Sequence, residues 1–206
     1  MNRLKLPARA KAIAIVAHPD DETIWLSGLL AKKKNWEWTI FSLCRASDPD
    51  RAPKFFKVCR HYGAQGLMAD MEDEGRLSLA ESEPVVEKLI KKYISGRGFD
   101  YIFTHGKNGE YGHVRHKAVY LAVKNLLTSG YFNNAKVFCF NCIKTGSKPL
   151  VRMIGAADSD LIIKLTKREY MRKRKVMTDI YGFTPDGIDT NYCTNPEAFK
   201  KLKSKN

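Results

Sequence analysis

The sequence predicts an α/β fold in which a mainly parallel sheet is flanked by helices. Three observations support this prediction. The apolar run at residues 12–17 is typical of a strand that is buried on both faces. Strand-like and helix-like segments alternate along the chain, as they do in βαβ units. Histidine-rich segments follow residues 12–17 and 99–104, and sites in such folds form at the carboxyl ends of strands.

The elements of the first half follow from local patterns. A helix is expected over 22–34, because apolar residues recur on one face and lysines close it. A strand over 38–43 precedes a helix over 52–62 that ends at Gly63. An acidic loop then leads to a helix over 83–95, with Pro84 expected in its first turn.

The second half continues the alternation after the strand at 99–104. A glycine-rich loop over 105–112 leads into a helix over 113–128 that ends near Gly130. The remaining predicted elements are strands over 135–140 and 161–165 and a basic helix over 166–179. The last residues are expected to be irregular, because prolines and glycines interrupt them. No linker or repeat divides the chain, so one domain is expected over 1–206.

Composition restricts the class of protein. The chain has 206 residues, 44% of them hydrophobic, which indicates a folded globule. It contains no apolar run long enough for a membrane helix and no signal peptide, so a cytoplasmic protein is expected. The five cysteines form an odd set with no disulfide pattern, and Cys139 and Cys142 are expected to be buried thiols in a strand.

The formal charge of +14 leaves a second class of function open. Basic clusters at 164–175 and 200–205 could attract nucleic acid or another anion. However, the aromatic residues are not interleaved with these clusters as stacking platforms would be, which argues against a nucleic-acid partner. The first strand-to-helix turn also lacks the glycine fingerprint of dinucleotide-binding proteins. Solvated helix faces and a frayed tail are the simpler interpretation.

Two motifs carry the chemistry. The first is Ala-His-Pro-Asp-Asp-Glu at 17–22, directly after the first strand. Crowded carboxylates are costly there unless a cation or hydrogen bonds compensate them, and His and Asp are good ligands for zinc and similar ions. A helix N-terminus would explain the acids, but it would not explain His18. This motif therefore predicts a metal site.

The second motif, Gly-Glu-Tyr-Gly-His-Val-Arg-His at 109–116, follows the strand at 99–104. If a helix begins at residue 113, His113 and His116 share one face, so that one could bind metal while the other faces substrate. Four of the five histidines fall at strand ends, whereas His61 is expected to be structural. The two motifs together indicate one shared metal centre.

At these two motifs the sequence resembles the LmbE-like, PIG-L-type de-N-acetylases, from about residue 12 to about residue 125. The resemblance implies a Rossmann-like fold and removal of the acetyl group from an N-acetylglucosamine-type substrate, with zinc or another divalent cation. It further implies site roles by motif position. His18, Asp21 and His116 correspond to the metal ligands, and Asp20 to the general base. His113 corresponds to a protonated oxyanion stabiliser.

Other residues are assigned to substrate. Tyr111 resembles a tyrosine that polarises the carbonyl in some family members, and Arg51 resembles a substrate-binding arginine. Arg45, Lys107 and Arg115 lie near predicted strand ends and suggest an anionic amino-sugar substrate. Arg115 also marks a departure, since many bacterial relatives carry an acid there that could hold a neighbouring histidine charged. A metal-binding protein without turnover is the remaining alternative.

Overall fold

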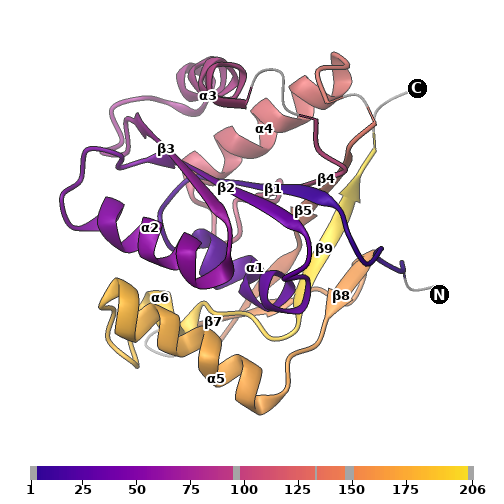
Figure 1. Ribbon diagram of the computed structural model, residues 1–206. Helices are drawn as coiled ribbons and strands as arrows, with labels where there is room; N and C mark the ends of the chain where they lie inside the picture. The colour runs from indigo at the N-terminus through magenta and orange to yellow at the C-terminus, as the bar shows by residue number, and fades with distance from the viewer. Residues whose placement is uncertain (1–3, 95–97, 133, 147–150, 204–206) are drawn as a thin grey trace.

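A seven-stranded sheet forms the centre of the computed structural model, which describes residues 4–94, 98–132, 134–146 and 151–203 (Figure 1). The strand order is β3-β2-β1-β4-β5-β9-β8. The first five of these strands run parallel, whereas β9 pairs antiparallel with both β5 and β8. A separate antiparallel hairpin joins β6 and β7. The strands are β1 Lys11–Val16, β2 Glu37–Cys44, β3 Gln65–Met71, β4 Tyr101–Thr104, β5 Lys136–Phe140, β6 Cys142–Thr145, β7 Arg152–Gly155, β8 Leu161–Ile163 and β9 Glu197–Leu202.

Helices cover both faces of this sheet (Figure 1). Alternate residues of β1 face opposite ways, so Ile13 and Ile15 pack with α3 and α4, whereas Ala14 and Val16 pack with α1 and α2. Each face therefore has its own apolar core. The helices are α1 Asp21–Lys32, α2 Arg51–Tyr62, α3 Leu79–Ile94, α4 Val114–Thr128, α5 Lys167–Val176 and α6 Ile188–Asn191, with a π-helical turn at Met177–Tyr181 after α5.

The strand order reverses direction at β1. The chain proceeds outward from β1 to β2 and β3, and then returns to place β4 on the other side of β1. Loops diverge at the carboxyl ends of two such strands, and open α/β sheets bind their ligands in the resulting crevice. His18 follows β1 and His105 follows β4, so the topology brings the two motifs together.

The predicted α/β class and parallel sheet are confirmed, and most predicted elements are present within a few residues of their expected bounds. Residue 95 of the predicted helix over 83–95 lies outside the described residues. That helix begins earlier, at Leu79, so Pro84 lies beyond its first turn. Strand β3 was not predicted. The expected irregular C-terminal end was wrong, because Lys200 and Lys201 belong to β9.

A buried ion pair fastens β9 to the first helix. The Glu197 carboxylate accepts hydrogen bonds from the Gly28 and Leu29 amides at 2.7 and 2.9 Å. The Lys173 ammonium on α5 lies 2.8 Å from the same carboxylate, and both side chains are fully enclosed. Gly28 leaves space for this contact, because a Cβ there would lie 2.3 Å from Leu165. The C-terminal segment is thus fixed to the helix that carries the first motif.

Replacing Glu197 by Gln is expected to lower the free energy of unfolding by about 3–5 kcal/mol, because Lys173 would become an uncompensated buried charge. Urea denaturation would measure the loss. Lys201→Gln on the exposed side of the same strand is the matched control, with an expected change within about 0.5 kcal/mol. Adding Lys173→Met to the Glu197 variant should recover part of the stability, and no recovery would contradict this account.

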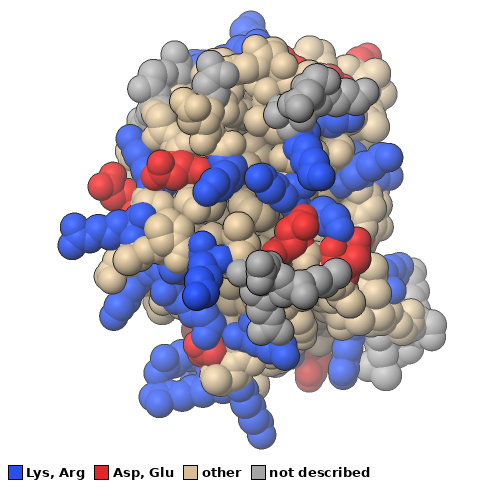
Figure 2. Space-filling model, turned by 90° about the vertical axis from the view of Figure 1, so that its right-hand side faces the viewer, with Lys and Arg blue, Asp and Glu red and all other residues tan. Residues whose placement is uncertain are grey.

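The surface agrees with the basic composition. Lys and Arg cover much more of the face in Figure 2 than Asp and Glu do. All five cysteines are free, as predicted, and all are buried, which confirms the prediction for Cys139 and Cys142. Among the described residues, no helix is both long and apolar enough to cross a membrane.

Candidate metal centre

A cavity of about 200 Å³ opens at the carboxyl ends of β1 and β4. Both motifs contribute to it, and so do the loop after β3 and the segment after α5. Its lining residues are His18, Pro19, Asp20, Asp21, Ile24, Arg45, Arg51, Asp73, Tyr111, His113, Phe183, Asp189 and Tyr192.

The loops around this cavity contain unusual backbone conformations. Asp20, Arg45 and Glu110 have φ angles of 129°, 68° and 55°, although none of them is glycine. Such conformations cost on the order of 1–3 kcal/mol each and concentrate at functional sites. At Asp20 the unusual turn lies between β1 and α1, where His18, Asp20 and Asp21 all face the cavity.

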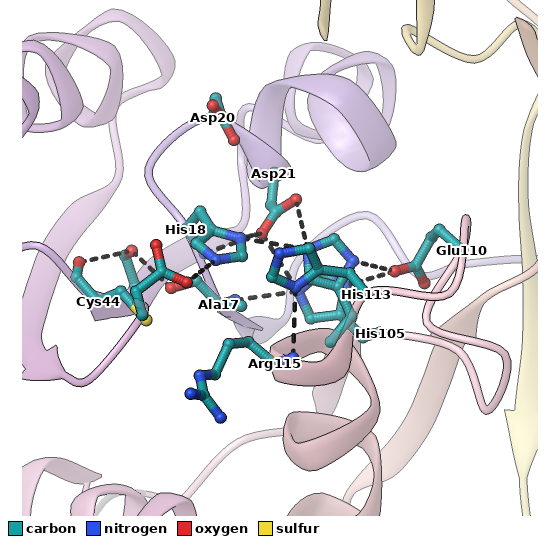
Figure 3. Close-up of polar contacts among 12 residues, drawn as sticks. Ala17, His18, Asp20, Asp21, Cys44, His105, Glu110, His113 and Arg115 are labelled. Atoms are coloured by element: carbon teal, nitrogen blue, oxygen red, sulfur yellow. Dashed lines mark hydrogen bonds and ion pairs between the residues drawn. The ribbon is translucent and has the colours of Figure 1, made fainter. Parts of the chain in front are cut away.

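Three potential metal ligands converge beside the cavity, and Figure 3 shows two of them, His18 and Asp21, next to each other. His18 Nδ1 lies 3.2 Å from His116 Nε2 and 3.3 Å from Asp21 Oδ2. His116 Nε2 lies 3.4 Å from the other oxygen of Asp21. Asp21 and His116 are buried, while His18 is partly exposed. Two imidazole nitrogens and one carboxylate therefore face a common point, which is the ligand chemistry of a catalytic zinc site.

The outer nitrogens of both histidines contact carboxylates. His18 Nε2 lies 2.8 Å from Asp73 Oδ1, and His116 Nδ1 lies 2.5 Å from Glu110 Oε2. Burial opposes ionisation of Asp73, but its bonds with His18 and Arg45 hold its pKa at about 2. Ionised carboxylates in these places keep the outer nitrogens protonated. Burial opposes protonation of His18, but Asp21 and Asp73 raise its pKa to about 10, so a bound cation would replace the proton on its inner nitrogen. Metal-binding histidines commonly have such partners.

Hydrogen bonding excludes His105 as a ligand. The Ala17 amide donates to His105 Nε2 at 3.0 Å, so that nitrogen is an acceptor and its lone pair is in use. The proton then lies on His105 Nδ1, which is 2.8 Å from Glu110 Oε2. Although Asp21, His105 and His116 place ligand atoms close together, His105 has no nitrogen free for a metal. It instead fixes the end of β1 and supports Glu110.

His113 lines the cavity at the start of α4. It caps α4, where its Nδ1 accepts a hydrogen bond from the Arg115 amide at 3.3 Å. Burial and the adjacent His116 and His18 lower the pKa of His113 to about 4. A neutral ring is therefore favoured when no cation is bound. The protonated His113 that the resemblance implies stays a prediction. The neutral ring carries its proton on Nε2, so it can donate one hydrogen bond but cannot ligate a metal through that nitrogen.

Four of the other predicted residues line the cavity, namely Asp20, Tyr111, Arg45 and Arg51. The Arg51 guanidinium lies 3.6 Å from the Asp20 carboxylate, and it stacks on the Phe183 ring at 4.5 Å. Burial and the neighbouring charge of Asp21 raise the pKa of Asp20 well above its usual value, while Arg51 acts in the opposite direction.

Two residues predicted to contact substrate, Arg115 and Lys107, do not line this cavity. The Arg115 guanidinium is buried against the Leu77 carbonyl, at 3.0 Å, and against Ser82 and Glu72. It holds the acidic loop against α3 and does not line the cavity. Lys107 is exposed and lines a different cavity with Lys117 and Lys200.

The sequence interpretation missed Asp73, Glu110 and the role of His105. Glu110 lies inside the second motif and contacts both His105 and His116 through one oxygen. Its position between glycines was a signal that could have found it. Asp73 follows the strand β3, which was not predicted. Without that strand, nothing placed this acid at the same edge of the sheet as His18.

The chain is similar to known proteins in sequence and in fold. The sequence model of the PIG-L family, described as GlcNAc-PI de-N-acetylase, matches residues 13–127. The uncharacterized protein L374 of Acanthamoeba polyphaga mimivirus is 25% identical over 128 residues, covering 54% of this chain and 55% of L374. The chain thus aligns with about half the length of this curated relative.

Two solved structures share the fold. A deacetylase of teicoplanin biosynthesis, in complex with teicoplanin, has a TM-score of 0.61 and 14% identity, over 94% of this chain and 100% of that one. GalB, a 4-carboxy-2-hydroxymuconate hydratase from Pseudomonas putida, has a TM-score of 0.61 and 10% identity, over 95% and 97% of the two chains. Because a deacetylase and a hydratase share this fold, the fold alone does not select a reaction.

Proposed function

This chain belongs to the PIG-L family of de-N-acetylases, and we propose that it is a metal-dependent hydrolase that removes the N-acetyl group from an N-acetylglucosamine-type substrate. The observation that carries the proposal is the convergence of His18 Nδ1, His116 Nε2 and the Asp21 carboxylate within 3.2–3.4 Å. Asp20 and His113 line the adjoining cavity.

The donor set fits zinc or another divalent cation. His18 and His116 would each offer one unprotonated nitrogen, and Asp21 would add a negative charge. A cation bound there would supply Lewis acidity both to an amide carbonyl and to an attacking water. The protein contributes the orientation of the ligands, because Asp73 and Glu110 fix the two rings.

The remaining residues move protons and stabilise charge. We assign Asp20 as the base that accepts a proton from the attacking water and passes it to the leaving amine as the C–N bond breaks. Its high pKa in the free protein suits a group that accepts and then releases a proton. His113 would donate from Nε2 to the developing oxyanion as a neutral group, and Tyr111 lies next to it with ring centroids 5.8 Å apart.

An anionic group on the substrate would favour binding here. Arg45 and Arg51 both line the cavity. Arg45 already pairs with Asp73 at 2.9 Å, whereas Arg51 is farther from Asp20, at 3.6 Å. Arg51 is therefore the better candidate for contacting a phosphate or other anion on an amino sugar.

The test combines metal analysis with acetate release. The purified protein is expected to hold about one divalent ion and to release acetate from at least one member of a panel comprising N-acetylglucosamine, its 1-phosphate, its uridine diphosphate ester and its inositol glycoside. Chelation should abolish release, and zinc should restore it. A protein that keeps its metal but releases no acetate from any of these compounds would favour the alternative of a metal-binding protein without turnover.

A nucleic-acid-binding role makes a separate prediction. Affinity for DNA or RNA would fall steeply between two ionic strengths, because phosphate contacts release counterions. We expect binding no stronger than that of an unrelated protein of equal charge. Tight and salt-dependent binding, without deacetylation, would replace the proposed function.

A further inference from the structure

A second cavity lies between α1, α2 and α5, at the other end of α1 from the metal centre. Its volume is about 410 Å³, within the range of small-molecule sites. Ser27 follows Asp21 by six residues, or roughly 9 Å along the helix. The lining residues are Ser27, Gly28, Leu30, Ala31, Lys34, His61, Tyr62, Glu169, Arg172 and Lys173. None of them lines the first cavity.

The Ser27 hydroxyl is the first sign of a ligand. Ser27 is only 2% exposed, yet its Oγ forms no hydrogen bond within the described part of the chain. The Tyr62 hydroxyl is near enough to interact with Ser27, but this contact lacks hydrogen-bond geometry. A helical serine usually bonds a carbonyl of the preceding turn when it has no other partner. Buried hydroxyls normally have a hydrogen-bond partner. An unpaired one that lines a cavity therefore indicates that a ligand supplies this partner.

The charge of the cavity identifies the kind of ligand. Glu197 neutralises Lys173, and Glu169 pairs with Lys32 at 2.6 Å. Lys34 and Arg172 form no ion pair within the described residues, and both are exposed to solvent, so they are available to an anion. His61 lines the same cavity and can donate a hydrogen bond to an anion.

Arginine and lysine together match a dianionic phosphate better than a monoanionic carboxylate. The remaining lining is largely apolar, with Leu30 and Ala31 on α1 and the Tyr62 ring on α2. Such a wall suits the apolar body of an organic phosphate. We propose that this cavity binds a small organic phosphate monoester, with its phosphate among Lys34, His61 and Arg172 and with a polar atom completing Ser27.

This site is independent of the proposed deacetylation, and so is its test. Calorimetric titration with phenyl phosphate would use the full chain carrying Arg51→Gln, before and after chelation, because the first cavity could bind phosphate through Arg51 or through a metal ion. We expect binding to persist after chelation, while benzyl alcohol does not bind. Absence of binding by the chelated protein would overturn the proposal.

Variants locate the site. Arg172→Gln is expected to weaken phenyl phosphate binding by about tenfold or more, since a charge-assisted bond is lost. Arg168→Gln, on the same helix but outside the cavity lining, should change it by less than about twofold. Ser27→Ala should weaken binding while raising the melting temperature of the free protein, because it removes an unpaired buried hydroxyl. Equal affinity in the Arg172 and Arg168 variants would place the phosphate elsewhere.

Discussion

Replacing Asp20 by Asn is expected to lower kcat for deacetylation by about 10²–10⁴-fold, the usual contribution of a positioned general base. The variant keeps the size of the side chain and removes its basicity. The Asp20 carboxylate forms no hydrogen bond or ion pair with His18 or His116, and it faces Arg51 instead. The metal content of the variant should therefore equal that of the parent protein, which elemental analysis would check.

The pH dependence offers a second test of the same residue. Burial and the charge of Asp21 raise the pKa of Asp20, and a bound cation would lower it again. Because a base must be ionised to act, activity should fall as the pH decreases through this pKa. Asp20→Asn should lose this acidic limb in its residual rate, whereas the exposed Asp186→Asn should keep it. A fully active Asp20 variant would remove this residue from the mechanism.

Sequence patterns predicted the strands β1, β2, β4 and β5 well, because they are buried apolar runs. They predicted β3 and β9 poorly. Gln65–Met71 contains glycine and no β-branched residue, and Glu197–Leu202 has exposed lysines after a buried glutamate. Strand β9 depends on tertiary contacts, since its Glu197 is stabilised by Lys173 and by two amides of α1. The local sequence pattern of residues 197–202 gives no indication of these tertiary contacts.

The candidate site shows the same division. The two motifs lie next to strand ends, so their meeting at β1 and β4 followed from topology alone. The hydrogen-bond partners that orient each histidine ring did not follow from topology. Which histidine can bind metal depends on the partner of its second nitrogen, and the Ala17 amide and Asp73 are distant in the sequence from the rings that they contact. Arg115 shows the reverse case, because a charged residue inside a motif faces the acidic loop instead of the cavity.

Loss of His116 is expected to have the other large effect, because it would remove one of three proposed ligands and the partner of Glu110. His116→Ala and His18→Ala should each reduce the bound metal from about one equivalent to nearly none, and deacetylation should disappear with it. His113→Gln and His105→Gln are the informative comparisons, since other groupings of close ligand atoms include these residues. Both variants should retain the metal.

The residues behind the ligands should have graded effects. Asp73→Asn and Glu110→Gln remove the charge that orients His18 and His116, so metal affinity should fall by about 10–100-fold. Competition with a chelator of known affinity would measure it. His61→Ala, far from the centre on α2, is the control and should bind metal normally. If His105→Gln lost its metal while His116→Ala kept it, His105 would be a ligand in place of His116. The hydrogen bond from the Ala17 amide would then not prevent His105 from binding metal.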